Sequence, residues 1–228
     1  MNSKAVSVCL KLITIVSAFT GILMSALAGR RAFMGGNTVF MYFTVQSNIA
    51  VAFLALIGLC FLLTKKKPGR AWDVIELVGT VAITLTGVVF CFVLAPTLGD
   101  KAWNLQNTLT HVVVPVAAIA DFFVMSKEYD IKKRSVFWVV VPPLLYAVYA
   151  GIGYVQGWEF YPGSNYPYFF LNWGSPAGAF GFSNEMPFVG TAWWILAILI
   201  FLIGIGLCYL FIADGIKKKA LSKANSRV

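Results

Sequence analysis

The sequence predicts an all-α, polytopic membrane protein built as a bundle of six transmembrane helices. First, 59% of the 228 residues are hydrophobic and only 12% are charged, and the mean hydropathy of +0.80 lies outside the range of soluble proteins. Second, six apolar runs are long enough to cross a hydrocarbon core of roughly 30 Å, for which about 20 helical residues suffice. Third, the polar gaps between runs are short, so residues 1–228 are expected to form one transmembrane domain.

The first three runs are residues 8–29, 41–63 and 73–95. We expect helices, because an open strand in lipid leaves backbone groups without hydrogen bonds. The first run is longer than the ~7 to 15 apolar residues of a signal peptide, which favours a retained helix. The second opens on the polar stretch YFTVQSN, and the third on Asp73 and Glu76.

The last three runs are residues 105–125, 135–155 and 190–213. Proline has no N–H, so Pro115 leaves the carbonyl of the residue four positions earlier without its helical partner and predicts a kink. Pro142 and Pro143 predict a bend or a gap in the fifth helix. The 34 residues between the fifth and sixth helices, 156–189, contain many aromatic residues and no lysine or arginine, which predicts an aromatic outer loop that caps the bundle.

The distribution of positive charge predicts the orientation of the chain. Of the 18 lysines and arginines, only Arg30, Arg31 and Lys101 fall on one side of the predicted helices, and the other 15 fall on the opposite side. By the positive-inside rule, both termini should be cytoplasmic, in a multi-pass protein of the plasma membrane. The net charge of +9 then reflects topology and contact with anionic lipid, and no nucleic-acid partner is expected.

Cysteine and histidine are too sparse to predict a metal centre. The four cysteines lie in four separate apolar runs without paired spacing, and the chain has one histidine. We therefore expect no metal site and no cofactor. The oligomeric state is not predictable from these features.

Polar residues near the predicted outer ends of the second and fourth helices suggest a site. Thr44, Ser47 and Asn48 are spaced i, i+3 and i+4, so they share one helix face, while Gln46 points elsewhere. Asn107 and His111 are likewise one turn apart on the fourth helix. Intramembrane polar groups turn away from lipid, so both faces should point into the bundle at similar depth.

Each of these residues also has a purely structural interpretation. Threonine and serine commonly bond a carbonyl one turn back and pack helices together, and this applies to Thr44 and Ser47. His111 could serve only as a hydrogen-bond partner of a neighbouring carbonyl. An ionisable side chain deep in the membrane commonly marks a functional site, so a functional role is also considered. Arg30 and Arg31 would anchor the chain at lipid headgroups or bind a substrate carboxylate.

Three short stretches resemble a known family. YFTVQSN at the second helix, HVVVP in the fourth and YPYFFLN in the outer loop resemble the androgen-induced gene family of multipass membrane threonine hydrolases, most closely its bacterial relatives. The resemblance implies cleavage of the ester bond in fatty acid esters of hydroxy fatty acids. It implies Thr44 as nucleophile and His111 as base. No acidic residue lies near His111 in sequence to orient it, which departs from a complete triad.

Two functions follow as hypotheses. The first is an intramembrane lipid ester hydrolase, in which imidazole removes the threonine proton. Asn48, Ser47 or Asn107 would contact substrate or oxyanion, and Tyr42 is a polar neighbour that would orient the base. The alternative is a non-catalytic membrane protein that binds or transports a lipid or small molecule in an outward-facing polar pocket.

Overall fold

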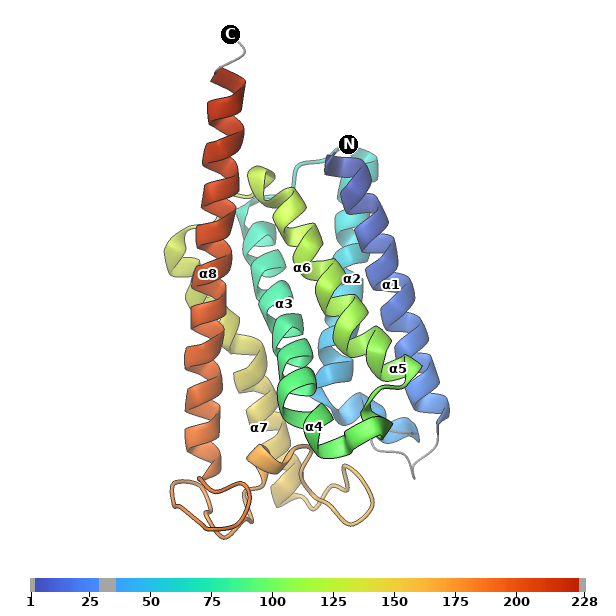
Figure 1. Ribbon diagram of the computed structural model, residues 1–228, viewed down its shortest axis with the longest axis vertical. Helices are drawn as coiled ribbons and strands as arrows, with labels where there is room; N and C mark the ends of the chain where they lie inside the picture. Colours follow the sequence, from blue (N-terminus) through green and yellow to red (C-terminus); the bar gives the residue numbers. More distant parts are fainter. Residues whose placement is uncertain (1–2, 29–35, 226–228) are drawn as a thin grey trace.

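The structure is a computed structural model that describes residues 3–28 and 36–225. Six helical segments within these residues are long and apolar enough to span a membrane. The predicted all-α bundle of six membrane-spanning helices is thereby confirmed (Figure 1). The segments are Ser3–Leu27, Phe43–Thr64, Arg70–Leu98, Leu105–Glu128, Lys133–Val155 and Thr191–Ser222.

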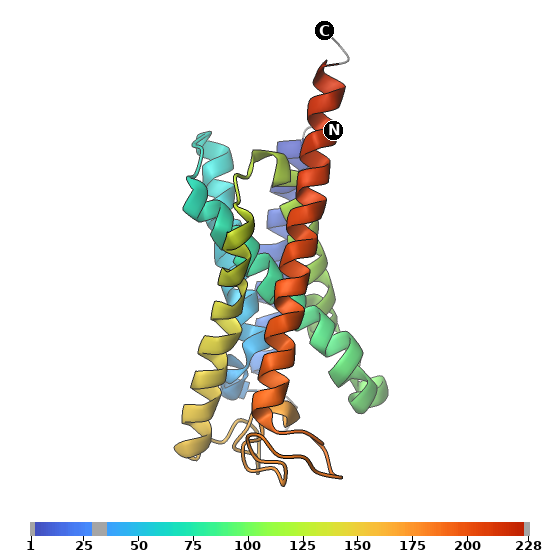
Figure 2. The same ribbon diagram turned by 90° about the vertical axis from the view of Figure 1, so that its left-hand side faces the viewer.

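Six long helices form most of these segments, and two single-turn helices belong to the end of the third span and the start of the fourth. The long ones are α1 (Ser3–Leu27), α2 (Phe43–Thr64), α3 (Arg70–Val89), α6 (Val114–Met125), α7 (Val141–Val155) and α8 (Thr191–Asn225), and the short ones are α4 (Ala95–Leu98) and α5 (Leu105–Thr108). The helix α1 packs against α2 and α6, and α3 packs against α2 and α6 from the other side. Figure 2 shows that α3 crosses the bundle obliquely, away from α7 at its C-terminal end.

Two π-helical segments interrupt the spans, and each directly precedes a proline turn. In Phe90–Leu94 the N–H of Ala95 donates to the carbonyl of Phe90, and Pro96 follows. In Leu109–Val113 the N–H of Val114 donates to the carbonyl of Leu109, and Pro115 follows. A proline has no N–H to donate within the helix. In the wider π-helical turn, the N–H of the residue before each proline donates to a carbonyl five positions earlier. The irregularity predicted at Pro115 is therefore a π-helical turn.

The prolines of the fifth span lie where its helical hydrogen bonding changes from 3-10 to α. Residues Lys133–Val140 form a 3-10 helix, and Pro142 and Pro143 lie in the first turn of α7. Proline fits the first helical turn, where N–H groups lack helical partners in any case. The 3-10 helix leads directly into α7, and at the junction the N–H of Val141 donates to the carbonyl of Trp138.

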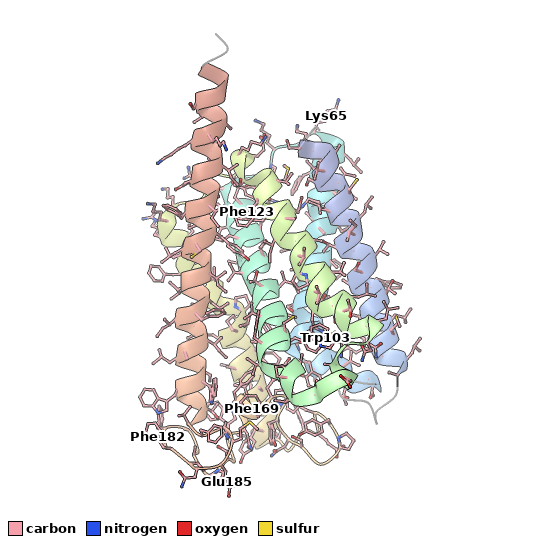
Figure 3. The ribbon with its side chains drawn as sticks, in the orientation of Figure 1. Lys65, Trp103, Phe123, Phe169, Phe182 and Glu185 are labelled. Carbon is pink, nitrogen blue, oxygen red and sulfur yellow. The ribbon has the colours of Figure 1, made fainter. Side chains whose placement is uncertain are left out.

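The loop between α7 and α8 covers one end of the bundle (Figure 1). Among its buried residues are Phe160, which is fully enclosed, and Phe170 and Leu171 of the 3-10 turn Phe169–Leu171. Figure 3 shows Phe169, Phe182 and Glu185 at this end and Lys65 at the opposite end, near both termini. The aromatic loop is thus the cap predicted from its composition. Which end faces the cytoplasm remains the prediction made from the charges.

One charge used in that prediction does not lie at the membrane surface. Lys11 is within α1, and its side chain is only 4% exposed. Its ammonium donates to Asp121 of α6 across 2.6 Å and lies 3.6 Å from Glu76 of α3. Lys11 therefore pairs with helix carboxylates inside the bundle, and Asp121 and Glu76 are buried with it.

Candidate functional site

The polar face of α2 turns into the bundle as its spacing predicts. Thr44 and Ser47 are each 5% exposed, and Asn48 is completely buried. Gln46 points away from them, and its side-chain amide donates to the carbonyl of Phe40. The i, i+3, i+4 spacing therefore produces one buried face at the start of α2, close to the loop that caps the bundle.

Ser47 fixes this face against α3. Its hydroxyl donates to the carbonyl of Thr44 at 3.0 Å and lies 2.7 Å from the hydroxyl of Thr86. With its own hydrogen used on Thr44, Ser47 accepts from Thr86. This arrangement matches the packing role of small polar residues between membrane helices.

Asn48 joins α2 to the segment that carries the histidine. Its amide nitrogen donates to the carbonyl of Thr44 at 2.8 Å and to the carbonyl of Thr110 at 3.1 Å. An amide nitrogen has two hydrogens, so both donors are in use and neither is left for an oxyanion. The predicted oxyanion contact of Asn48 is therefore not supported. Its carbonyl oxygen is buried without a hydrogen-bond partner.

His111 lies in the π-helical segment Leu109–Val113 and is 2% exposed. Its Nδ1 lies 3.0 Å from the carbonyl of Asn107 and 3.0 Å from the hydroxyl of Thr110. Because the Thr110 hydroxyl donates to the carbonyl of Gln106, both neighbours of Nδ1 act as acceptors. These acceptors select the tautomer with hydrogen on Nδ1 and a lone pair on Nε2.

The Nε2 atom of His111 is buried and has no hydrogen-bond partner. An unpaired polar atom in a membrane interior is costly unless a ligand or a moving group pairs with it. The ring is held in place, because Phe90 stacks on it with ring centroids 3.8 Å apart and an angle of 22° between the planes. Phe90 belongs to the other π-helical segment, so the two irregular turns meet at the imidazole.

Gly87 allows α3 to approach the histidine closely. A Cβ atom at Gly87 would lie 3.0 Å from the carbonyl oxygen of His111 and 3.2 Å from the ring of Pro115. This carbonyl is the one that Pro115 deprives of its helical donor. The site is therefore assembled where a proline, a glycine and two π-helical turns coincide.

Thr44 and His111 share one buried layer but are not hydrogen-bonded to each other. The hydroxyl of Thr44 lies 3.4 Å from the hydroxyl of Tyr168. Asn48 provides the connection, because it bonds Thr44 and also bonds Thr110, the residue next to His111. Direct transfer of the Thr44 proton to Nε2 would require one of these side chains to rotate or a water molecule to bridge them.

Tyr168 of the capping loop is a site residue that the sequence patterns did not single out. The N–H of Thr44, in the first turn of α2, points at the phenolic oxygen at 3.4 Å. Tyr42, the residue before this helix, makes no side-chain cap, so Tyr168 takes that position. Burial raises the pKa of Tyr168 above that of a free phenol, and its hydroxyl stays protonated at neutral pH. The one signal in the sequence that pointed to Tyr168 is its place in YPYFFLN, one of the three stretches that carry the family resemblance.

Thr44 opens onto an apolar cavity, which we call the threonine cavity. It is a partly open cavity of about 60 Å³ between α2, α3, α7, α8 and the capping loop. The side-chain hydroxyls on its wall belong to Thr44, Thr86, Tyr146 and Tyr168, and Pro143 and Ile198 are among its apolar contacts from α7 and α8. Phe90 forms part of the same wall while stacking on His111, so it separates the imidazole from the cavity.

The other predicted contacts are placed elsewhere. The Tyr42 hydroxyl donates to the carbonyl of Phe160, which ties α2 to the capping loop and does not orient the histidine. The side-chain amide of Asn107 donates to the carbonyl of Ala102, and it is the backbone carbonyl of Asn107 that contacts His111. Arg30 and Arg31 lie outside the described residues. No group of three histidine, cysteine or acidic side chains within residues 3–28 and 36–225 is arranged to bind a metal.

Comparison with known proteins identifies no relative of this chain. No family model matches it, and neither a curated protein nor a solved structure does.

Proposed function

We propose that the protein is an intramembrane lipid ester hydrolase with Thr44 as nucleophile and His111 as base. The observation that carries the proposal is the unpaired, buried Nε2 of His111, whose Nδ1–H is fixed by the Asn107 carbonyl. Asn48 links this imidazole segment to Thr44, which lines an apolar cavity. The resemblance to the androgen-induced gene family supports the same pair of residues.

In the proposed first step, the Thr44 side chain rotates toward the imidazole or a water molecule bridges the two. The Thr44 oxygen attacks the ester carbonyl carbon while Nε2 takes the hydroxyl proton, directly or through that water. The tetrahedral intermediate then collapses, the bond to the alcohol oxygen breaks, and Nε2–H returns the proton to that oxygen. The alcohol leaves and the acyl group remains on Thr44. Asn107 takes the role of an orienting third residue through its carbonyl, which keeps Nδ1 protonated and so leaves Nε2 as the base.

Two donors are suited to the oxyanion of that intermediate. The N–H of Thr44 lies at the N-terminal end of α2, where the helix dipole favours negative charge. The hydroxyl of Tyr168 lies beside it, and its neutral form is the donor. Removing one such donor typically lowers kcat by about 10² to 10³.

The second step needs a water molecule held near the acyl group. The Nε2 of His111 and the Oδ1 of Asn48 are both buried acceptors without partners. A water donates two hydrogens, so it would pair with these acceptors while its oxygen attacks the acyl carbon. Nε2 takes one water proton, the acyl–oxygen bond to Thr44 breaks, and the proton returns to the Thr44 oxygen. The fatty acid is released.

The substrate would enter from the lipid. The wall of the threonine cavity is apolar on the α7 and α8 sides, where Pro143, Ala147, Ile195 and Ile198 contribute. Contact between α7 and α8 themselves is sparse. An acyl chain can pack there by apolar contact while its ester lies at the hydroxyl end near Thr44.

Hydrolysis by purified variants tests the proposal. In detergent or vesicles, release of fatty acid from a long-chain acyl ester should be lost in Thr44→Ala and in His111→Gln, and largely retained in Thr44→Ser, which keeps the hydroxyl. Ser47→Ala is the matched control, because Ser47 lies one turn away on the same face. Its hydroxyl bonds the Thr44 carbonyl and Thr86, so the mechanism does not use it as the substrate contact considered from the sequence. Equal hydrolysis by wild type and Thr44→Ala would refute the proposal.

The second candidate function is binding or carriage of a lipid without chemistry. The specific observation in its favour is that the Thr44 hydroxyl lies next to Tyr168 and makes no bond to His111. In that case an ester lipid would co-purify and be recovered intact after prolonged incubation. Thr44→Ala would then change the affinity for the lipid and not its turnover.

A further inference from the structure

A second polar site joins α1, α3 and α6, away from the capping loop. Figure 1 shows that both termini lie at the end of the bundle opposite that loop. Three ionisable side chains from three helices meet at this site. Lys11 donates to Asp121 at 2.6 Å, and the Ser7 hydroxyl donates to the other oxygen of Asp121 at 2.5 Å. Glu76 approaches the same ammonium less closely, at 3.6 Å. One ammonium thus serves two carboxylates.

This cluster contains more negative than positive charge. With both carboxylates ionised, Lys11 balances Asp121, and the charge on Glu76 is left without a full partner. The side chains of Lys11, Glu76 and Asp121 are 4%, 9% and 8% exposed, so water balances this charge only weakly. Buried charges in membrane helices are retained when they pair with another charge or mark a binding site. Glu76 is therefore suited to bind a cationic group.

A cavity leads from Glu76 to the lysine-rich end of the bundle. It is a partly open cavity of about 150 Å³ and contacts Lys11 and Glu76 on its inner side. Lys65, Lys66 and Lys67 line its other side and are exposed. Figure 3 shows Lys65 at this end of the molecule. The cavity thus has positive charge at its mouth and excess negative charge deeper in the bundle, a pattern that matches a ligand with separate anionic and cationic groups.

Part of the cavity wall is apolar and aromatic. The rings of Phe61 and Trp72 meet edge to face with centroids 5.2 Å apart, and both line the cavity with Leu62. Tryptophan beside lysine is the usual composition of a membrane helix at the level of the lipid headgroups. This wall suits a lipid better than a free, water-soluble phosphoamine.

We propose that this cavity binds the headgroup of a phospholipid that carries a phosphate and a primary ammonium, as in phosphatidylethanolamine. The ammonium donates to the Glu76 carboxylate, and the phosphate accepts from Lys65, Lys66 and Lys67. A primary ammonium has three N–H donors, whereas the trimethylated ammonium of phosphatidylcholine has none. Phosphatidylglycerol keeps the phosphate and lacks the cation. This site is independent of the hydrolase proposal.

Native mass spectrometry of the full chain with lipids of matched acyl chains tests the site. Phosphatidylethanolamine should bind about tenfold more tightly than phosphatidylcholine or phosphatidylglycerol, the ratio expected from one charge-assisted hydrogen bond. Glu76→Gln keeps the shape of the side chain and removes its charge, so this preference should disappear. The thermal midpoint of the variant reports whether it stays folded.

A pair of lysine variants separates the cavity from general surface charge. Lys66→Ala combined with Lys67→Ala should weaken binding of all three lipids, because all three carry the phosphate. Lys218→Ala combined with Lys219→Ala removes the same charge from α8 and should leave the affinities unchanged, since these residues do not line the cavity. Equal binding of phosphatidylethanolamine and phosphatidylcholine, retained preference in Glu76→Gln, or equal loss in the two double variants would each overturn the proposal.

Discussion

Replacing Lys11 with methionine tests how the bundle accommodates charge inside the membrane. The change keeps an unbranched side chain and removes the ammonium that donates to Asp121 at 2.6 Å and lies 3.6 Å from Glu76. Of the two hydrogen bonds to Asp121 described above, the one from the Ser7 hydroxyl would remain. Breaking a buried ion pair by removing one partner costs about 3–5 kcal/mol. We expect the free energy of unfolding to fall by that amount, because two buried carboxylates lose the cation that pairs with both of them.

Equilibrium unfolding in mixed detergent micelles, followed by tryptophan fluorescence or circular dichroism, measures this change. Lys132→Met, at an exposed position, is the control and should stay within ~0.5 kcal/mol of wild type. Adding Asp121→Asn to Lys11→Met should recover part of the loss, since one unpaired carboxylate is removed. A loss below ~1 kcal/mol for Lys11→Met, with no recovery in the double variant, would refute the reasoning.

Three further predictions concern the site and its support. Tyr168→Phe removes one donor beside Thr44 and should lower kcat about 10²-fold or more with little change in fold, whereas unchanged kcat would exclude that donor. Gly87→Ala should destabilise the protein by about 1–3 kcal/mol, because the added Cβ would lie 3.0 Å from the His111 carbonyl oxygen. Gly204 has open space around it, so Gly204→Ala should leave stability unchanged or raise it. Equal shifts of the thermal midpoint in the two variants would contradict this. Burial raises the pKa of Tyr42 and of Tyr168 above 10.0, so the free energy of unfolding should be constant below about pH 10 and fall as the pH rises further, by at most ~1.4 kcal/mol per pH unit for each tyrosine. A thermal midpoint that increases with pH above pH 10, or the same pH dependence in Tyr42→Phe as in wild type, would count against it.

The sequence predicted the features that depend on local pattern. Apolar length placed all six spans, although the first helix begins earlier than predicted, at Ser3, and the sixth continues past the predicted end to Ser222. Helical spacing placed Thr44, Ser47 and Asn48 on one buried face and Gln46 on another. Pro115 indicated an irregular turn at His111, although not that the turn would be π-helical. These follow from hydropathy and from the geometry of a single helix.

Features that depend on contacts between distant segments were not predictable. Lys11 looked like a surface charge until the packing of α1 against α6 paired it with Asp121. Tyr168 reaches Thr44 only because the capping loop folds back over the start of α2, 124 positions away in the chain. The roles considered for Asn48 and Tyr42 changed for the same reason, since their hydrogen bonds go to Thr110 and Phe160.

Covalent trapping at Thr44 is the most direct test of the proposed hydrolase. Purified protein would be mixed with an activated long-chain acyl ester, quenched in acid and digested, and the peptide carrying Thr44 examined by mass spectrometry. The proposed mechanism predicts an acyl group on the Thr44 oxygen that forms within the turnover time, is absent in Thr44→Ala and forms far more slowly in His111→Gln. Turnover of the ester with no acyl group on Thr44, or acylation at the same rate in His111→Gln, would contradict it.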